Sequence, residues 1–185
     1  VLPVLPEAAL NFEQPEAFLK DPALLESYRT LLSSLKFRSF EGLDVVVVSS
    51  TLAGEGKSAI ASHLGAVSAT LSKRTLIIDA DLRRPTQHKL FNLAVRPGLT
   101  DVVKGKVSVA EAVQQTKIEN LSVLTCGEAE VYPSQFFESQ QMRALIAEAA
   151  SHYEIVIVDT PPVTSCVDAL TLSRDQTRLL LVARP

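Results

Sequence analysis

Short runs of apolar residues alternate along this chain with longer segments in which apolar residues recur every three or four positions. The run Val45–Val48 contains no polar residue, which is typical of a strand that is buried on both faces of a sheet. The segment that contains Ile60, Leu64 and Val67 has the spacing of an amphipathic helix. This alternation predicts an α/β domain with a mostly parallel central sheet flanked by helices on both faces.

The same patterns locate the other elements. Apolar runs predict strands at residues 45–48, 74–81, 121–124, 155–158 and 179–182. Helical spacing predicts helices at residues 22–36, from 57 onward, at 133–151 and at 168–172, with short helices joined by turns over 86–118. Residues 1–20 have little periodicity and many Pro, Ala and Glu residues, so we expect an extended arm or linker before a domain at 21–185.

Composition narrows the function classes. The chain has 185 residues, of which 46% are hydrophobic and 21% charged, as expected of one globular domain. The net charge of -3 gives no basic surface for nucleic acid. The two cysteines, Cys126 and Cys166, are too few for a disulfide framework and favour a reducing compartment. No apolar run is long enough to span a bilayer, and we expect no signal peptide at the start.

The segment between the first strand and the following helix has the composition of a phosphate-binding loop. Glycines let backbone N–H groups turn toward phosphate oxygens, and a helix N-terminus adds partial positive charge. We expect Lys57 to lie against the β- and γ-phosphates of a nucleotide and the Ser58 hydroxyl to hold Mg²⁺. Thr51 stands where the full motif has its first glycine, so the loop is a variant. The predicted nucleotide-binding residues are Gly54, Glu55, Gly56, Lys57, Ser58 and Ala59.

Two of the apolar strands end in aspartates, at the sheet edge where α/β proteins bind ligands. Asp79 and Asp81 follow the second predicted strand and Asp159 follows the fourth. Buried carboxylates that lie close together are unfavourable unless a cation neutralises them, and Mg²⁺ on a nucleotide is such a cation. We expect Asp159 to contact Mg²⁺, directly or through water, and Asp79 or Asp81 to be a general base. The alternative is that these aspartates only cap turns.

Three segments resemble the Walker A, Walker A′ and Walker B motifs of bacterial tyrosine kinases, the cytoplasmic domains of polysaccharide co-polymerases. These segments are SSTLAGEGKS, LIIDADLRRP and IVIVDTPP, and the resemblance extends to GLTDVVKGK and PSQFF. It implies a P-loop NTPase-like fold, ATP and Mg²⁺ as cofactors, and autophosphorylation on tyrosine. It also implies regulation of capsular or exopolysaccharide export from the cytoplasmic face of the inner membrane, with a membrane segment as activator.

The resemblance also assigns roles residue by residue. Lys57 binds phosphate as a catalytic residue, and Ser58 binds Mg²⁺. Asp79, the first carboxylate of the Walker A′ pair, matches the proposed base. Asp81 and Asp159 match the metal-linked carboxylates.

The chain departs from the family pattern in the motif for oligomerisation. The family's oligomerisation motif is Glu-x-x-Arg-x-x-Arg, whereas this chain has Glu26, Arg29 and then Leu32. We therefore expect a weak homo-oligomer. Related ATPases of cell division and plasmid partition carry a signature lysine early in the loop, where this chain has Leu52.

The family phosphorylates a tail with clustered tyrosines, from its own or a neighbouring subunit. The tyrosines of this chain are Tyr28, Tyr132 and Tyr153. We expect Tyr28 and Tyr153 to be held back by the core and Tyr132 to lie in a loop, so the chain should bind Mg·ATP yet phosphorylate itself poorly. Two alternatives remain open: a nucleotide-binding assembly module without kinase activity, and an ATPase of the partition or cell-division type.

Overall fold

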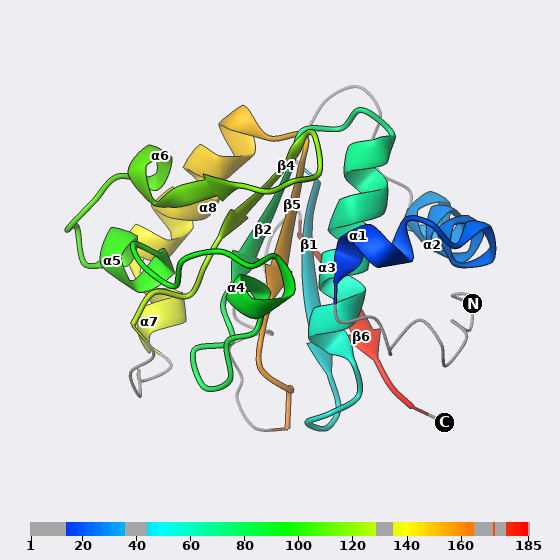
Figure 1. Cartoon of the computed structure of the whole chain (residues 1–185). Helices are drawn as coiled ribbons and strands as arrows, with labels where there is room; N and C mark the ends of the chain where they lie inside the picture. Colours follow the sequence, from blue (N-terminus) through cyan, green and yellow to red (C-terminus); the bar gives the residue numbers. More distant parts are fainter. Residues whose placement is uncertain (1–13, 36–43, 129–134, 165–171, 173–176, 185) are drawn as a thin grey trace.

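A computed structural model of the chain describes residues 14–35, 44–128, 135–164, 172 and 177–184 (Figure 1). The described residues form a six-stranded sheet in the order β3-β4-β2-β5-β1-β6. Neighbouring strands are parallel except β3 and β4, which are antiparallel. The strands are β1 (Asp44–Ser50), β2 (Thr75–Asp79), β3 (Val113–Gln115), β4 (Leu121–Leu124), β5 (Ile155–Asp159) and β6 (Thr177–Val182). The predicted mostly parallel α/β sheet is confirmed.

Helices cover both faces of this sheet, as predicted (Figure 1). On one face lie α1 (Pro15–Phe18), α2 (Pro22–Ser34) and α3 (Lys57–Thr70). On the other face lie α5 (Leu99–Val103), α6 (Val109–Ala112), α7 (Gln135–Glu138) and α8 (Gln140–His152), and α4 (Gln87–Leu90) follows β2 near the base of α3. Among the described residues, no helix combines the length and the apolar character needed to cross a bilayer.

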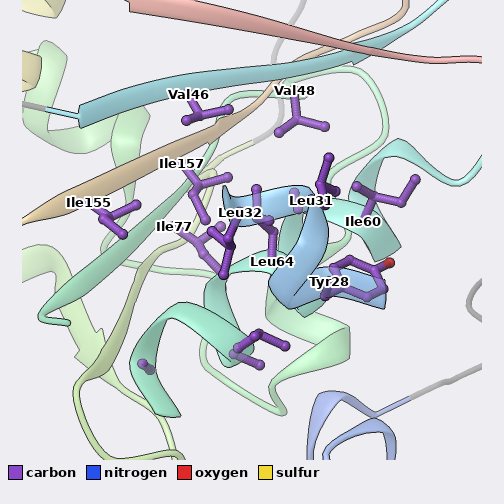
Figure 2. Close-up of a cluster of buried hydrophobic side chains, with 14 of the residues drawn as sticks. Tyr28, Leu31, Leu32, Val46, Val48, Ile60, Leu64, Ile77, Ile155 and Ile157 are labelled. Atoms are coloured by element: carbon purple, nitrogen blue, oxygen red, sulfur yellow. The ribbon is translucent and has the colours of Figure 1, made fainter. Parts of the chain in front are cut away.

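The four consecutive valines of β1 are buried because the sheet is covered on both sides. Val46 and Val48 pack into the cluster beneath α2 and α3, whereas Val45 and Val47 pack into the cluster beneath α8. Figure 2 shows the first cluster, in which Leu32 from α2 points toward the strands. The apolar run without alternation is thus explained by burial on both faces.

Within residues 14–20, expected to belong to an extended arm, α1 (Pro15–Phe18) forms instead and packs on the domain. Phe18 is fully buried and stacks on the His63 ring, with ring centroids 4.1 Å apart and an interplanar angle of 3°. Tyr28, as expected, is also fully buried, and its hydroxyl lies 3.2 Å from His63 Nδ1. Burial of the Phe18 and Tyr28 rings stabilises the packing of α1 on the domain. An extended linker would have no such apolar burial to hold it in place.

Two other predictions need correction. The single helix expected at 133–151 is interrupted at Ser139, which has extended backbone geometry and whose hydroxyl accepts a hydrogen bond from Met142 N. Residues 113–115, expected within a helix-and-turn region, form β3 because they pair with β4. Residues 168–171 of another expected helix lie outside the described residues.

Candidate functional site

The segment between β1 and α3 has the predicted strand–loop–helix geometry. β1 ends at Ser50 and α3 begins at Lys57. Gly54 and Gly56 have φ of 86° and 90°, a left-handed conformation that other residues rarely adopt. The loop therefore requires glycine at both positions and directs its chain into the N-terminus of a 14-residue helix. Such a terminus presents unpaired N–H groups and partial positive charge, which suits phosphate oxygens.

The side chain of Glu55 holds this loop closed. Its carboxylate accepts hydrogen bonds from Leu52 N at 2.7 Å and from Arg184 N at 3.3 Å. The bond from Leu52 N is the main reason that the pKa of Glu55 is lowered. Any contact of Glu55 with phosphate therefore falls to its main chain. Ser58 and Ala59 are half-buried in the first turn of α3.

Strand register brings the predicted carboxylates beside the loop. Asp79 of β2 is directly opposite Asp159 of β5, and β5 is also paired with β1. The Lys57 ammonium lies 2.7 Å from Asp81 Oδ2 and 3.5 Å from Asp159 Oδ1. It also donates to the Ser58 hydroxyl at 3.0 Å. The residues predicted to be catalytic and metal-binding thus gather around one ammonium group.

Asp79 and Asp81 each use one carboxylate oxygen to hold the turn that follows β2. Asp79 Oδ2 accepts from Thr86 N at 3.0 Å and from Gln87 N at 2.9 Å. Asp81 Oδ1 accepts from Arg84 N at 3.0 Å, and its other oxygen contacts the Lys57 ammonium. Asp79 Oδ1 is buried and has no hydrogen-bond partner among the described residues. Capping and a chemical role are therefore compatible, because they use different oxygens.

Burial and mutual repulsion set the charge states of the site. Burial raises the pKa of Asp79 well above its usual range, and the neighbouring Asp159 carboxylate raises it further. Burial also raises the pKa of Asp159, although the Lys57 ammonium opposes that shift. For Lys57 itself, burial lowers the pKa, but the carboxylates of Asp159 and Asp81 outweigh burial and raise it. Asp79 is thus a stronger proton acceptor than an exposed aspartate.

Gln87, the first residue of α4, is a site residue that the sequence did not identify. It is fully buried, and its side-chain amide donates to Asp159 Oδ2 at 2.8 Å and to the Ser58 carbonyl oxygen at 3.0 Å. Its sequence position, two residues after Pro85, is compatible with an ordinary helix start. Its place in the segment that follows Asp79 is the one sequence feature that could have identified Gln87 as a residue of the site.

The donor set fits a nucleotide with Mg²⁺. Asp81 and Asp159 share the single ammonium of Lys57, and Asp79 lies opposite Asp159, so a divalent cation would offset the negative charge gathered here. Within the described ranges, no group of three or more His, Cys, Asp or Glu side chains could hold a metal by itself. Magnesium at nucleotide sites uses one or two carboxylates and completes its coordination with phosphates and water.

The chain is similar to known proteins over most of its length. A family model described as an AAA domain matches residues 43–182. Tyrosine-protein kinase YwqD of Bacillus subtilis is 40% identical over 148 residues, which are 80% of this chain and 62% of YwqD. Tyrosine-protein kinase Etk of Escherichia coli is 35% identical over 161 residues, which are 86% of this chain but 22% of that protein. The chain therefore spans only part of both relatives.

Solved structures agree with these matches. The kinase domain of Escherichia coli tyrosine kinase ETK superposes with a TM-score of 0.83 at 32% identity, covering 95% of this chain and 70% of that chain. The septum site-determining protein MinD of Pyrococcus horikoshii, complexed with Mg-ADP, superposes with a TM-score of 0.63 at 19% identity. That match covers 77% of this chain and 58% of the MinD chain, and shows a shared fold alone.

Proposed function

Because this chain belongs to the family of bacterial tyrosine kinases, we propose that the domain transfers the γ-phosphate of ATP to a tyrosine hydroxyl. The arrangement of Lys57 carries this proposal. Lys57 is the first residue of α3, the helix that follows the glycine-bearing loop. Its ammonium lies 2.7 Å from the Asp81 carboxylate. A phosphate-binding loop beside buried carboxylates supplies the positioning and charge that phosphoryl transfer requires.

We assign binding of the triphosphate to the backbone N–H groups of residues 54–59 and to the Lys57 ammonium. Ser58, Asp81 and Asp159 would hold Mg²⁺, which offsets the charge of the phosphates when it is bound. Lys57, released from its carboxylate contacts, would face the β- and γ-phosphates. The groups assigned to these roles already lie close together, since the Lys57 ammonium contacts the Ser58 hydroxyl and both carboxylates.

Asp79 is the proposed general base. The tyrosine oxygen forms a bond to the γ-phosphorus while the bond from that phosphorus to the β–γ bridging oxygen breaks, and ADP leaves. The phenolic proton passes to Asp79, whose Oδ1 accepts no hydrogen bond from the described residues. The raised pKa of Asp79, caused first by burial, favours this proton transfer.

A partition-type or cell-division-type ATPase is the second candidate, because MinD shares the fold. The loop itself opposes that candidate. Leu52, at the position of the signature lysine of those ATPases, is 59% exposed and carries no charge. An assembly module that binds ATP without transfer is opposed by Asp79 Oδ1, which is buried without a hydrogen-bond partner in the described part of the chain. Nucleotide binding alone needs no such proton acceptor.

The acceptor is expected to be a tyrosine outside the core. Tyr28 is fully buried and burial raises the pKa of its hydroxyl, whereas Tyr153 is half-buried at the end of α8. Tyr132 lies outside the described residues. We propose that a flexible tail, from the same or a neighbouring subunit, supplies the acceptor.

Joining a tyrosine-rich segment after residue 185 should therefore increase phosphotyrosine formed per chain. Tethering raises the effective concentration of the acceptor to about the millimolar range. The measurement is mass-spectrometric mapping after incubation with Mg·ATP, and the matched control carries phenylalanine in place of each added tyrosine. Strong labelling at Tyr28 in the control would contradict this account of the acceptor.

Assembly is expected to be weak. Glu26 and Arg29 are exposed on α2 and form an ion pair at 3.8 Å, available to a neighbouring subunit. Leu32, the third motif position, is 5% exposed and packs in the core. Because exposed ion pairs contribute about 0–1 kcal/mol each, two residues should not hold a ring together at micromolar concentration. A stable ring seen by light scattering would show that this face of α2 needs no third residue.

The intact protein is proposed to act at the cytoplasmic face of the inner membrane, where a separate membrane segment would activate the domain. Regulation of capsular or exopolysaccharide synthesis and export follows as the proposed role. The support is membership of the kinase family together with matches that cover only part of the relatives.

A further inference from the structure

Gln87 links three residues of the proposed active site. Its main-chain N–H donates to Asp79 Oδ2 at 2.9 Å. Its side-chain nitrogen donates to Asp159 Oδ2 at 2.8 Å and to the carbonyl oxygen of Ser58 at 3.0 Å. One buried amide therefore bridges the end of β5 and the first turn of α3.

These contacts fix an orientation that the sheet leaves open. Pairing of β5 with β1 and β2 places the Asp159 main chain, but the carboxylate can still rotate about its side-chain bonds. With Oδ2 held by Gln87, Asp159 Oδ1 faces the Lys57 ammonium at 3.5 Å. The hydrogen bond from Gln87 to the Ser58 carbonyl oxygen also fixes the distance between Ser58 and the Asp159 carboxylate. The Ser58 hydroxyl is the group assigned to Mg²⁺.

A role in packing alone does not explain a glutamine here. Gln87 is fully buried, and its side-chain oxygen has no hydrogen-bond partner within the described residues. A buried polar atom without a partner destabilises a fold, so an apolar residue of similar size would serve packing better. The amide is useful because it donates to two groups at once.

We propose that Gln87 is a positioning residue for the Mg²⁺ of the nucleotide complex. By holding the Asp159 carboxylate and Ser58 together, it lets both groups meet the ion without rearrangement. This inference rests on the proposed function, which assigns Ser58 and Asp159 to Mg²⁺. Partners that orient metal ligands in this way typically change metal affinity by about 10- to 100-fold when they are removed.

The test is nucleotide binding by Gln87→Met, a change that keeps the side-chain length and removes the amide. ADP affinity is measured by calorimetry, first in EDTA and then over a series of Mg²⁺ concentrations. We expect the affinity in EDTA to match that of the parent chain, because the loop is intact. The Mg²⁺ concentration that gives half of the Mg²⁺-dependent gain should rise by about 10- to 100-fold.

Gln114→Met is the matched control. Gln114 also bridges main-chain groups, since its amide exchanges hydrogen bonds with Ala94 N and O, but it lies on β3, on the edge of the sheet away from β1. The control should change thermal stability alone. A structural role of Gln87 would likewise change only stability, so a selective shift in Mg²⁺ dependence separates the two roles. In the transfer assay, excess Mg²⁺ should restore the kcat of Gln87→Met.

An unchanged Mg²⁺ requirement in Gln87→Met overturns the inference. So does an equal loss of affinity in EDTA or a loss of the fold seen by circular dichroism, because either result makes Gln87 a general structural residue. The binding readout needs no catalysis. If the parent chain transfers no phosphate to tyrosine but Gln87→Met still shifts the Mg²⁺ requirement, the proposed function fails and the role of Gln87 stands.

Discussion

Asp79→Asn is expected to lower the rate of phosphoryl transfer to tyrosine by about 10²- to 10⁴-fold, the usual contribution of a general base. Asparagine keeps the size of the side chain, and its amide oxygen can still accept from Thr86 N and Gln87 N, as Asp79 Oδ2 does. It cannot accept the phenolic proton. Mg·ATP affinity should be retained, so single-turnover transfer and calorimetric binding together separate the base from a binding residue.

The same substitution should stabilise the nucleotide-free fold at neutral pH. The pKa of Asp79 is raised in the folded state, first by burial and then by the charge of Asp159. A carboxyl with a raised folded pKa reduces stability at pH values above its unfolded pKa of about 3.9, increasingly so until its folded pKa is passed. Asparagine removes that penalty. Thermal unfolding should therefore show a higher Tm for the variant at pH 7 and a smaller difference near pH 4.

Asp101→Asn is the matched control for this prediction. Asp101 is also buried, but its carboxylate pairs with Arg96 at 2.9 Å. Burial raises the pKa of Asp101, yet the bonds from Arg96 and Gly98 N outweigh burial and lower it. Its substitution should destabilise the fold at neutral pH and leave transfer intact. If Asp79→Asn transfers phosphate at the parental rate, Asp79 is not the base, and Asp81 becomes the next candidate.

Lys57→Ala is expected to abolish tight binding of Mg·ATP and to destabilise the fold by about 3–5 kcal/mol at neutral pH. The ammonium is buried against Asp81 and Asp159, and its loss leaves both carboxylates without their cation. The raised pKa of Lys57 means that its stabilisation is present below about pH 10.4 and is lost as the pH rises through the folded value.

The destabilisation by Lys57→Ala should shrink in acid, because protonated carboxyl groups need no ammonium. Chemical unfolding at pH 7 and pH 4 measures the difference. Lys73→Ala is the control: Lys73 also contacts a carboxylate, Glu154, at 2.9 Å, but both side chains are partly exposed, so we expect a change of about 0–1 kcal/mol. Equal stability of Lys57→Ala and the parent chain at pH 7 would contradict the proposed charge compensation.

Much of this fold was predictable because a strand that is buried on both faces of a sheet has a continuous apolar run. Such a run does not alternate between apolar and polar residues, so it can be recognised in the sequence. The β1 valines and the apolar residues of β2 and β5 carry that signal directly. The short strand β3 was missed, since its three residues owe their conformation to pairing with β4. The break at Ser139 was missed because a single residue, the N-cap of α8, separates two helical segments.

The site was only partly predictable. Asp79, Asp81 and Asp159 could be assigned to one edge of the sheet because parallel strands share their carboxyl ends. That Asp79 lies opposite Asp159 depends on the strand order, which brings β2 next to β5, and sequence patterns do not determine that order. Gln87 was not predictable, because its role comes from two side-chain contacts across 29 and 72 positions of the chain.

The activity proposed for this site is transfer of phosphate to tyrosine rather than to water. The most direct measurement follows γ-labelled ATP during one turnover with Mg²⁺ and an excess of a tyrosine-rich peptide. The label is then divided between phosphotyrosine and inorganic phosphate. We predict that most of it appears in phosphotyrosine and that Asp79→Asn suppresses this transfer. Release of the label as inorganic phosphate, with no phosphotyrosine, would contradict the account and identify the domain as an ATPase.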